Sequence, residues 1–526
     1  MNDELESFSV TDWKYKAEGN KHIVICDGKG KVLRLVKLTG PLPEQESHSL
    51  QSRDGYPAKS PSLFITEHGS TENKDELDFM EHVVLPLMNN CDACHIPKYV
   101  QLSKLFYEEM RIRIDKDRPE HRKHKSLDCN APGLLMHDHC FIPFSKQYQS
   151  LFANGLSSRS DLVTVEIKPK RGYMTTDAAM TEAKLSKHKV CQYCRTQIYR
   201  VVHGQRFKKC SFYCPLDLFS GVEECMNLAL KELFRTPQNN FRIFRNGKLE
   251  FSQDIIDASR ETCNITPDHL LQPLLSSNFF DDYSCVNDIM NLLVDLVRQS
   301  LLLPIVEKHD HETVISEHCL GLYLKEHLCK QTPQNAIQRT TNCAGKLPAN
   351  CILGLIHSLQ LLDHHSISDI KHHYDTVTSS GQLNLDLNEH LACDAPYSSD
   401  EWCTFINSIL KNGNSASDRD EKHKSADLLR KFLVAKSFSD CSVMVSFQRI
   451  IDPSVKSLQH LKKSLSSRSP TAHLNMLQDK KGQNYIVSVA VVDTDPKFSQ
   501  KIPDYYNQHT KIMEWWEKIL QNSFFS

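Results

Sequence analysis

Two aspartates flank a pair of apolar runs late in the chain and could carry phosphoryl-transfer chemistry. Asp440 precedes the run Cys441–Phe447, and Asp493 follows the run Tyr485–Val492. If the runs pair as antiparallel strands, both carboxylates meet at one edge of the sheet, with Asp495 close by. Phosphoryl transfer needs one carboxylate to hold Mg²⁺ on the phosphates and another to orient the attacking hydroxyl. Acidic residues also flank strands as simple turn formers, so spacing alone leaves that alternative open.

Lysines and arginines gather in local clusters, although the formal net charge is only −2. The main clusters lie within residues Lys168–Arg171, Arg195–Lys209, Arg242–Lys248 and Lys497–Lys501. There is no global basic field of the kind that nucleic-acid or membrane binding requires, so we expect neither partner. Any anion site must therefore be local. Taken singly, each cluster could equally be a solvated face.

One group of cysteines has the spacing of a zinc site. Cys191-x-x-Cys194 is preceded by His188 and followed by Cys210 and Cys214. These ligand types suit tetrahedral Zn²⁺. Free buried thiols are an equally good interpretation, because a cysteine-rich chain contains such pairs by chance.

The remaining cysteines bear on the compartment. A second pair, Cys91-x-x-Cys94-His95, lacks an obvious partner pair, and the total of 19 cysteines is odd. Disulfide scaffolds are short and carry even numbers, so the pattern favours a reducing compartment, and we expect the cytoplasm and nucleus. The acidic start and the absence of a long apolar run indicate neither secretion nor a membrane span.

Alternation and helical periodicity predict the elements that must position these residues. A β-hairpin is expected over His22–Val36, and a buried strand over Leu162–Lys168. A second hairpin is expected over Arg242–Leu249, where Asn246-Gly247 supplies a tight turn. Helices are expected over residues 77–88, 100–112, 222–234, 427–436 and 510–521.

Three segments carry little interpretable pattern. Residues 40–62 and 412–425 are rich in polar residues and predict loops or disorder. Residues 252–398 look helical and irregular and predict an insertion-rich cap. Standard nucleotide motifs are missing: GxxxxGK[ST], a GxGxxG before a helix, HRD and DFG. A P-loop enzyme, a Rossmann dehydrogenase and an ordinary protein kinase are therefore poor fits.

Six short motifs, in order, resemble those of the inositol-pentakisphosphate 2-kinase family. They are Trp13–Lys21 with Val32–Arg34, Glu166–Gly172, Tyr213–Gly221, Gln238–Asn240 with Arg242, Ser439–Ser442, and Asp493–Lys497. The matches extend over most of the chain except the loops and the middle region.

The resemblance implies a fold, an activity and cofactors. The fold is α+β and bilobal, distantly related to protein kinases, with an N-lobe over residues 1–140 and a C-lobe over residues 141–526 that includes a variable helical insertion at 252–425. The activity is transfer of phosphate from ATP to the 2-hydroxyl of inositol 1,3,4,5,6-pentakisphosphate, giving inositol hexakisphosphate. ATP and Mg²⁺ are the implied cofactors, with structural Zn²⁺ as a further candidate, and we expect a monomer.

The resemblance also implies residue roles. Lys168, Asp440 and Asp493 are catalytic, with Asp440 serving the 2-hydroxyl and Asp493 and Asp495 holding Mg²⁺. The nucleotide contacts are Gly19, Asn20, Arg34, Asp138, His139 and Glu166. The substrate contacts are Arg122, Lys170, Arg200, Asn239, Asn240, Arg242, Lys497, Lys501, Tyr505 and Tyr506. Distant lysines and arginines converging on one polyphosphate would give the basic clusters a single purpose.

Two alternatives remain. One is a kinase of the same broad fold that acts on another inositol phosphate or a lipid headgroup, although the PxxxDxKxG signature of the multikinases is missing. The other is a catalytically inactive scaffold that binds inositol phosphates and contains zinc. The joint presence of Lys168, Asp440 and Asp493 argues against the scaffold.

Overall fold

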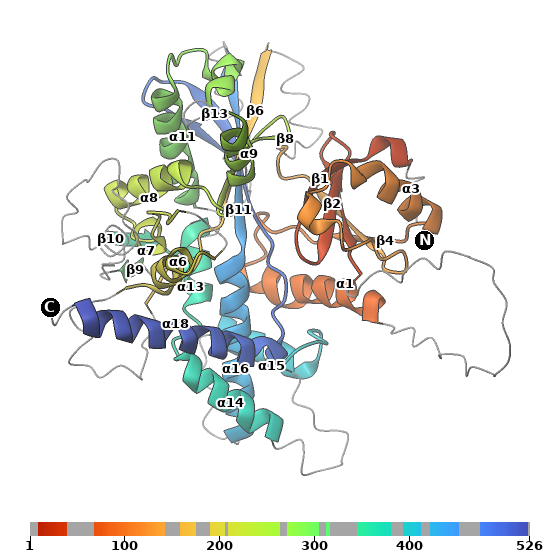
Figure 1. Ribbon diagram of the computed structural model, residues 1–526, viewed down its shortest axis with the longest axis vertical. Helices are drawn as coiled ribbons and strands as arrows, with labels where there is room; N and C mark the ends of the chain where they lie inside the picture. Colours follow the sequence, from red (N-terminus) through yellow and green to blue (C-terminus); the bar gives the residue numbers. More distant parts are fainter. Residues whose placement is uncertain are drawn as a thin grey trace. The chain divides into compact units, whose positions relative to one another are not determined.

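The computed structural model describes residues 9–38, 68–142, 158–174, 190–205, 209–263, 271–304, 312–315, 345–379, 393–411, 421–451 and 474–523. The chain forms two compact units. The first unit comprises Met1–Leu77 and His95–Asp138, and the second comprises Asp78–Cys94 and His139–Ser526. Each unit has its own antiparallel sheet (Figure 1), which agrees with the α+β class expected from the sequence. The kinship with protein kinases stays a prediction.

The sheet of the first unit has five strands in the order β1-β2-β3-β5-β4. They are β1 (Lys14–Glu18), β2 (His22–Cys26), β3 (Lys31–Val36), β5 (Gly133–His137) and β4 (Lys98–Val100). The expected first hairpin is confirmed, since His22 pairs with Val36 and Cys26 with Val32. Gly28 and Gly30, at φ of 68° and 117°, supply the left-handed backbone that its turn requires.

One helix, α3 (Lys104–Asp115), covers this sheet. Its buried Phe106 and Met110 share a core with Trp13 and Leu33. The helix begins four residues later than expected because Val100 pairs with Gly133 in β4, and the Ser103 hydroxyl then caps the helix by accepting from the Phe106 N–H at 3.2 Å.

A buried carboxylate fixes the turn between β1 and β2. Glu18 accepts hydrogen bonds from Arg118 Nε and Nη2, both at 3.1 Å, and from the Lys37 ammonium. Burial raises the pKa of Glu18, but these two cations outweigh it and hold that pKa below its usual value. Lys37 also donates to the Gly19 carbonyl at 2.8 Å. The turn that carries Gly19 and Asn20 is therefore held by charge-assisted bonds.

The sheet of the second unit has six antiparallel strands in the order β12-β13-β11-β6-β7-β8. They are β12 (Leu474–Gln478), β13 (Asn484–Val492), β11 (Ser442–Ile451), β6 (Ser158–Ile167), β7 (Phe241–Arg245) and β8 (Lys248–Phe251). The expected pairing of the two late strands is confirmed. Ser442 lies opposite Val492, and Val443 lies opposite Ile167 of β6 on the other side.

The hairpin of β7 and β8 turns at Asn246-Gly247, as expected. Both residues have left-handed φ values, 49° and 80°, which is the geometry of a type I′ turn. The Asn246 side chain also accepts from the Leu162 N–H at 2.9 Å, so the turn is tied to β6.

The second unit is rich in helices (Figure 1). They are the π-helical turn η2 (Met80–Val84), α2 (Leu85–Leu87), α6 (Gln192–Val202), α7 (Pro215–Leu218), α8 (Glu223–Arg235), α9 (Gln253–Cys263), α11 (Val286–Leu301), α13 (Ile352–Gln360), α14 (Ile367–Ser379), α15 (Asp400–Leu410), α16 (Glu421–Asp440) and α18 (Ile502–Ser523). The helix before them, α1 (His68–Phe79), belongs to the first unit up to Leu77. Short 3₁₀ turns (Val10–Asp12, Glu120–Arg122, Gln272–Ser276, Asn278–Phe280 and Ser499–Lys501) and a small pair, β9 (Glu312–Ile315) with β10 (Gly345–Pro348), complete the described elements.

The middle of the chain belongs to the main core. Leu293 of α11, Ile356 of α13 and Trp402 of α15 are buried in the same apolar cluster as Val165 and Val445 of the sheet. The region from which a cap was expected therefore supplies α11, which packs on β12 and β13, and two further helices that join the same core. Its apolar residues show helical spacing, but nothing in that spacing identifies the surface on which a helix packs.

The prediction of a loop over residues 412–425 is partly wrong. Residues 421–425 form the start of α16, a helix of 20 residues that continues directly into Asp440 and β11. The polar sequence there is explained by exposure of that end, although Ser425 itself is buried. The expected loop at residues 40–62 lies outside the described residues. None of the described helices combines the length and apolarity needed to span a bilayer.

Candidate active site

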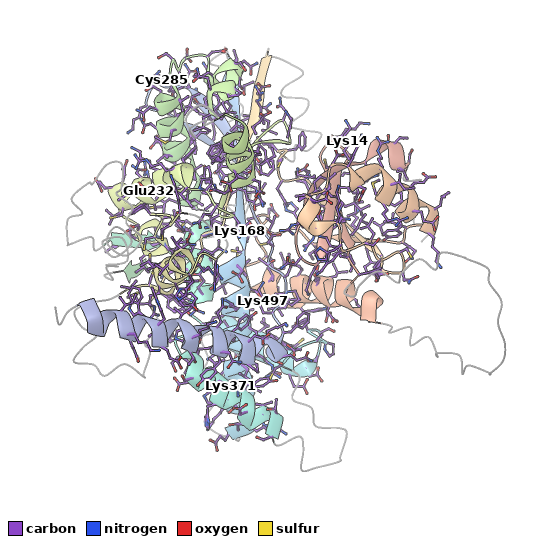
Figure 2. The ribbon with its side chains drawn as sticks, viewed as in Figure 1. Lys14, Lys168, Glu232, Cys285, Lys371 and Lys497 are labelled. Carbon is purple, nitrogen blue, oxygen red and sulfur yellow. The ribbon has the colours of Figure 1, made fainter. Side chains whose placement is uncertain are left out.

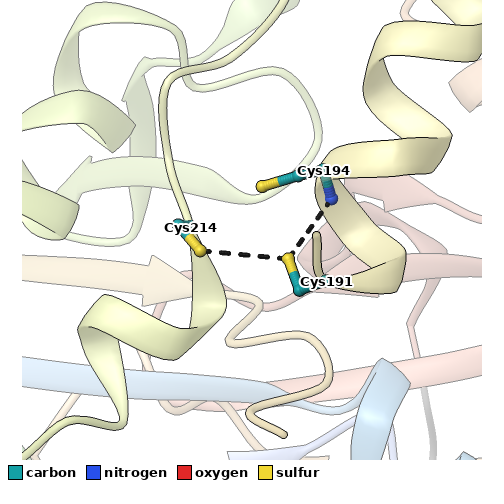
Figure 3. Close-up of side chains that lie close together, drawn as sticks. All are labelled: Cys191, Cys194 and Cys214. Atoms are coloured by element: carbon teal, nitrogen blue, oxygen red, sulfur yellow. Dashed lines mark hydrogen bonds between the residues drawn. The ribbon is translucent and has the colours of Figure 1, made fainter. Parts of the chain in front are cut away.

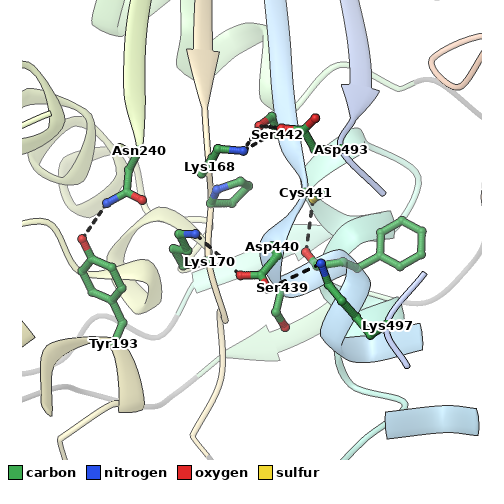
Figure 4. Close-up of polar contacts among 12 residues, drawn as sticks. Lys168, Lys170, Tyr193, Asn240, Ser439, Asp440, Cys441, Ser442, Asp493 and Lys497 are labelled. Atoms are coloured by element: carbon green, nitrogen blue, oxygen red, sulfur yellow. Dashed lines mark hydrogen bonds and ion pairs between the residues drawn. The ribbon is translucent and has the colours of Figure 1, made fainter. Parts of the chain in front are cut away.

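Four chain segments meet at one edge of the larger sheet. Because neighbouring strands are antiparallel, the ends of β6 and β13 lie beside the starts of β11 and β7. This edge brings Lys168, Asp440 and Asp493 together, as expected from the sequence (Figure 4). Lys168 and Lys497, labelled in Figure 2, come from the segments that follow β6 and β13.

Lys168 lies between two carboxylates and a hydroxyl. Its Nζ is 2.7 Å from Asp493 Oδ2, 2.7 Å from Ser442 Oγ and 3.9 Å from Glu166 Oε1. Burial lowers the pKa of Lys168, but Asp493 and Glu166 outweigh it and raise that pKa above its usual value. Lys168 is therefore a fixed ammonium group beside an exposed carboxylate.

Glu166 is held on its other side by Arg242. Arg242 Nη1 donates to Glu166 Oε2 at 3.0 Å, and Ser442 Oγ lies 3.0 Å from Oε1. Burial raises the pKa of Glu166, yet Arg242 and Lys168 hold it below its usual value. Ser442 was not expected as a site residue. Its hydroxyl joins Lys168, Glu166 and Asp493 in one network.

Asp440 lies in a cluster of ammonium groups. Lys170 Nζ is 3.7 Å from its Oδ1, and Lys497 Nζ is 3.8 Å from its Oδ2. Burial raises the pKa of Asp440, but Lys436, Lys170 and Lys497 outweigh it and hold that pKa well below its usual range. The carboxylate is therefore ionised at neutral pH and able to accept a hydrogen bond from a hydroxyl.

The backbone at this edge is strained at two points. Lys170 and Asp493 have left-handed φ values of 63° and 59°, which residues other than glycine adopt rarely. Such conformations cost about 1–3 kcal/mol and persist where the surroundings over-determine them, which is common at functional sites. Both residues lie in the segments that follow β6 and β13, at the same sheet edge as Asp440 (Figure 4).

A cavity of about 380 Å³ opens beside Asp440. Its lining includes the expected Lys170, Arg200, Asn239, Asn240 and Tyr505. Among the described residues it also includes Arg171, Gln192, Tyr193, Arg195, Thr196, Gln197, Lys436, Ser439, Gln508, His509, Ile512 and Met513. The cavity is therefore lined by five lysines and arginines and one carboxylate, Asp440.

Two of the unexpected cations are positioned by helices. Lys436 precedes Asp440 by one turn of α16, and its Nζ lies 4.9 Å from the centre of the Tyr505 ring. Arg195 extends from α6 and donates to Met513 Sδ at 3.0 Å. The i, i+4 spacing of Lys436 and Asp440 was a usable signal in the sequence. No signal marked Arg195 beyond its place in a basic cluster.

A family model described as inositol-pentakisphosphate 2-kinase matches residues 15–511 of the chain. The chain belongs to this family. It is 27% identical to the inositol-pentakisphosphate 2-kinase of Danio rerio over 523 residues, which is 98% of the chain and 95% of the relative. The Arabidopsis thaliana enzyme of that name is 30% identical over 267 residues, 47% of the chain and 54% of the relative. That of Oryza sativa subsp. indica is 24% identical over 533 residues, 98% of the chain and 95% of the relative. The resemblance drawn from the six motifs is confirmed.

The other expected substrate contacts of this family member lie outside the cavity lining. Arg242 is paired with Glu166, and Lys497 lies beside Asp440. Lys501 is exposed and lies 3.3 Å from Asp504 of α18, and Tyr506 is half-buried on the same helix. Arg122 belongs to the first unit. Their contacts with substrate stay predictions.

Most expected nucleotide contacts belong to the first unit. Arg34 Nη2 lies 3.0 Å from His22 Nδ1, and both oxygens of Asp138 accept from Lys16 at 2.6 Å. Asn20 lies in the turn after β1 and accepts from Lys125 through its carbonyl at 3.3 Å. His139 begins the next part of the second unit, where its carbonyl accepts from Ser446 at 2.6 Å. Asp495, the second expected metal ligand, accepts from Ser437 through its carbonyl at 2.9 Å.

Three of the four candidate zinc cysteines meet in the second unit (Figure 3). The sulfurs of Cys191, Cys194 and Cys214 all lie within 4.8 Å of one another, and those of Cys191 and Cys214 are 3.9 Å apart. Tetrahedral Zn²⁺ with bonds of about 2.3 Å separates its sulfur ligands by about 3.8 Å. Cys210 is buried in the same apolar cluster. His188 lies outside the described residues.

The second cysteine pair has no comparable setting. Cys91 and Cys94 are buried, but no third potential ligand joins them within that distance in the part of the chain that the structure describes. Of the two cysteine groups, only the one at the start of α6, with Cys191, Cys194 and Cys214, is arranged in the described residues as a zinc site would be. That helix also carries Arg195 and Arg200 to the cavity.

Proposed function

We propose that the chain transfers the γ-phosphoryl group of ATP to the 2-hydroxyl of inositol 1,3,4,5,6-pentakisphosphate, producing inositol hexakisphosphate. The observation that carries this proposal is the cation-lined cavity at Asp440, which adjoins the network of Lys168, Glu166 and Asp493 on the same sheet edge. A polyanion binding site thus lies beside groups suited to phosphoryl transfer. The names of the relatives agree with this substrate.

Charge supports the substrate class. Lys170, Arg171, Arg195, Arg200 and Lys436 come from three separate segments and line one cavity. Several convergent cations suit a compact ligand with five phosphates, because each phosphate offers charge-assisted hydrogen bonds. Asn239 and Asn240 add neutral groups that can bind phosphate or hydroxyl oxygens. A lipid headgroup with one or two phosphates would leave most of these charges uncompensated.

Asp440 is the group we assign to the 2-hydroxyl. Its carboxylate lines the cavity and stays ionised, so it can accept the hydroxyl hydrogen bond and orient the oxygen toward the transferring phosphate. Lys168 would contact the transferring phosphate, since its ammonium group is held beside Asp493. Lys170 follows Lys168 by two residues, and its ammonium group lies 3.7 Å from Asp440 Oδ1.

Asp493 and Asp495 are the residues we assign to Mg²⁺. Carboxylate oxygens suit this cation, and the Asp493 side chain is half exposed at the sheet edge. When bound, Mg²⁺ neutralises charge on the phosphates of the nucleotide. Gly19, Asn20, Arg34, Asp138, His139 and Glu166 are the nucleotide contacts in this proposal, which includes a bilobal kinase-like arrangement.

The activity is tested directly by incubating the purified protein with ATP, Mg²⁺ and a panel of inositol phosphates. We expect inositol hexakisphosphate to form from the 1,3,4,5,6-pentakisphosphate faster than any other product forms. Binding without turnover would support the inactive scaffold instead. Faster turnover of a different inositol phosphate would assign the cavity to that substrate.

Arg200→Ala is expected to raise the KM for inositol pentakisphosphate about tenfold, because one charge-assisted phosphate contact stabilises binding by about 1.5–3 kcal/mol. The KM for ATP should change little, since Arg200 lies in the cavity and not beside Lys168. Steady-state kinetics in both substrates measure this. Lys371→Ala, which removes a partly exposed lysine of α14 outside the cavity lining, is the matched control. A parallel loss of ATP affinity would contradict the assignment.

We also propose that Cys191, Cys194 and Cys214 bind a structural Zn²⁺, with Cys210 or His188 as the fourth ligand. The sulfurs of Cys191 and Cys214 are 3.9 Å apart, close to the separation in a tetrahedral zinc site, and the Cys194 sulfur lies within 4.8 Å of both. Cys191 caps α6 and accepts from the Cys194 N–H at 3.4 Å, so the site would fix the start of the helix that carries Arg200. The ion would contribute folding energy and take no part in the reaction.

Cys194→Ser is expected to remove bound zinc and lower the melting temperature by several degrees, since losing a structural metal removes stabilising free energy. Metal analysis of protein purified without chelator, together with thermal melts, measures both. Cys285→Ser, at an exposed cysteine, should leave zinc content and melting temperature unchanged. Wild-type protein that contains no zinc would refute the site.

A further inference from the structure

One fully buried side chain joins two backbone segments at the site. Gln360, the last residue of α13, has no exposed surface. Its Nε2 donates to the Lys170 carbonyl at 2.9 Å and to the Phe438 carbonyl at 3.1 Å, and its Oε1 accepts from the Gly172 N–H at 2.8 Å. Both amide hydrogens and the oxygen are used, so these partners fix the orientation of the amide.

The two segments carry groups that face each other. One segment follows β6 and contains Lys170. The other is the last turn of α16, in which Phe438 precedes Asp440 by two residues. Lys170 Nζ lies 3.7 Å from Asp440 Oδ1. Gln360 itself does not line the cavity and lies behind the backbone of both segments. A change at Gln360 can therefore act on the reaction only through the residues that it holds.

The segment of Lys170 is fixed unusually well. Lys170 adopts a left-handed φ of 63°, and the strain must be offset by the contacts around it. His357, one turn before Gln360, lies with its Nε2 3.2 Å from the Gly172 carbonyl, so α13 binds both polar groups of Gly172. A Cβ at Gly172 would lie 2.4 Å from the Phe219 ring, which leaves the backbone no room to move toward α7.

We propose that Gln360 is a positioning residue that sets the relative placement of Lys170 and Asp440. This inference rests on the proposed function, because it concerns how the cavity presents a cation and a carboxylate to the substrate. It assigns a role to the middle region of the chain, from which no functional residue was expected. The amide transmits the position of the α16 end to the strained loop through three hydrogen bonds.

The first test compares two glutamine substitutions of similar shape. Gln360→Met removes all three hydrogen bonds and keeps the volume, and Gln448→Met is the matched control. Gln448 is a buried glutamine of β11 whose amide donates to the Ser160 carbonyl at 3.2 Å, away from the cavity. We expect Gln360→Met to lower kcat/KM for inositol pentakisphosphate at least about tenfold, with the KM for ATP changed less than about twofold. If Gln360→Met fails to fold, Gln360→Glu takes its place, because it keeps the acceptor and loses both donors.

The second test asks whether Gln360 acts through Lys170. In a Lys170→Met background, Gln360→Met should lower kcat/KM by less than about threefold, whereas independent effects would multiply. Multiplicative losses would overturn the proposal. So would kinetic constants for Gln360→Met that match those of Gln448→Met, because both changes would then be purely structural.

A binding measurement separates failure of the inference from failure of the proposed function. Calorimetric titration with inositol hexakisphosphate needs no turnover, and we expect both Gln360→Met and Lys170→Met to bind it about tenfold more weakly than wild type. Wild-type protein that binds but does not phosphorylate would refute the proposed kinase activity and leave the positioning role standing. Wild-type affinity in Gln360→Met would refute the positioning role alone.

Discussion

Asp440→Asn is expected to lower kcat at least about a thousandfold while the affinity for inositol pentakisphosphate stays unchanged or rises. The substitution keeps the size of the side chain but removes the charge that would orient the 2-hydroxyl and accept its proton. Affinity should not fall, because Asp440 is the one carboxylate among the described residues that line the cavity, and it repels a polyanionic ligand.

The apo variant should also melt at a lower temperature than wild type. Removing Asp440 leaves Lys436, Lys170 and Lys497 close together without its compensating charge. A bound polyphosphate supplies that charge, so inositol hexakisphosphate should stabilise the variant more than it stabilises wild type. This combination separates loss of catalysis from loss of the binding site.

Steady-state kinetics, calorimetric titration and thermal melts measure the three effects. The matched control is Asp504→Asn, which removes a carboxylate that pairs with Lys501 on the surface of α18. It should leave kcat within about twofold of wild type. If Asp440→Asn retains a tenth or more of the wild-type kcat, Asp440 does not serve the 2-hydroxyl, and another acceptor must be sought among the cavity residues.

The edge of the larger sheet could be predicted because its determinants are local. The apolar runs 441–447 and 485–492 specify strands, and antiparallel pairing then places Asp440 and Asp493 at one edge whatever the rest of the fold does. The hairpin at Asn246-Gly247 is similar, since two residues with left-handed φ determine the turn. At these positions the local sequence was sufficient to predict the structure without knowledge of tertiary contacts.

Residues whose roles depend on distant contacts could not be predicted in this way. Gln360 reaches Lys170 across 190 positions and Phe438 across 78, and no spacing in the sequence relates them. Ser442 joins Lys168, 274 positions away, because β11 pairs with β6, although the pairing of those two strands was not expected. The start of α3 was misplaced for the same reason, since β4 exists only through its pairing with β5.

Only some of the lysines and arginines that line the cavity could be predicted from the sequence. Lys170 and Arg200 were expected from the resemblance and line the cavity. Lys436 was missed because a lysine in a helix is usually solvated, whereas here the packing of α16 against Tyr505 of α18 leaves its side chain half-buried. Burial lowers the pKa of Lys436, and the Asp440 carboxylate opposes that shift by stabilising the ammonium form. A bound phosphate would stabilise the ammonium charge further.

Asp493→Asn is expected to lower kcat by at least about a hundredfold and to raise the Mg²⁺ concentration needed for half-maximal rate. Asparagine is among the few residues that tolerate left-handed backbone, so the φ of 59° at this position should be retained. The side chain keeps its shape and loses only its charge. The loss should therefore appear in metal dependence and turnover and leave the fold intact.

The consequence for Lys168 sharpens this expectation. Its Nζ is 2.7 Å from Asp493, and the variant leaves it with Glu166, at 3.9 Å, as its nearest described carboxylate. Lys168 should then shift toward Glu166 and away from the transferring phosphate, which adds a loss that extra Mg²⁺ does not restore. Saturating Mg²⁺ should accordingly recover only part of the wild-type kcat.

Asp375→Asn provides the matched control for this experiment. Asp375 pairs with Lys371 at 2.6 Å on α14, and its side chain is 55% exposed, close to the 48% of Asp493, but it lies outside the cavity lining. A surface ion pair of this kind contributes at most about 1 kcal/mol, so the control should retain wild-type kinetics. Rates measured over a Mg²⁺ titration at saturating ATP and inositol pentakisphosphate distinguish the two variants. An Asp493→Asn enzyme with an unchanged Mg²⁺ requirement would show that the metal is held elsewhere, and Asp493 would then be retained only as the group that positions Lys168.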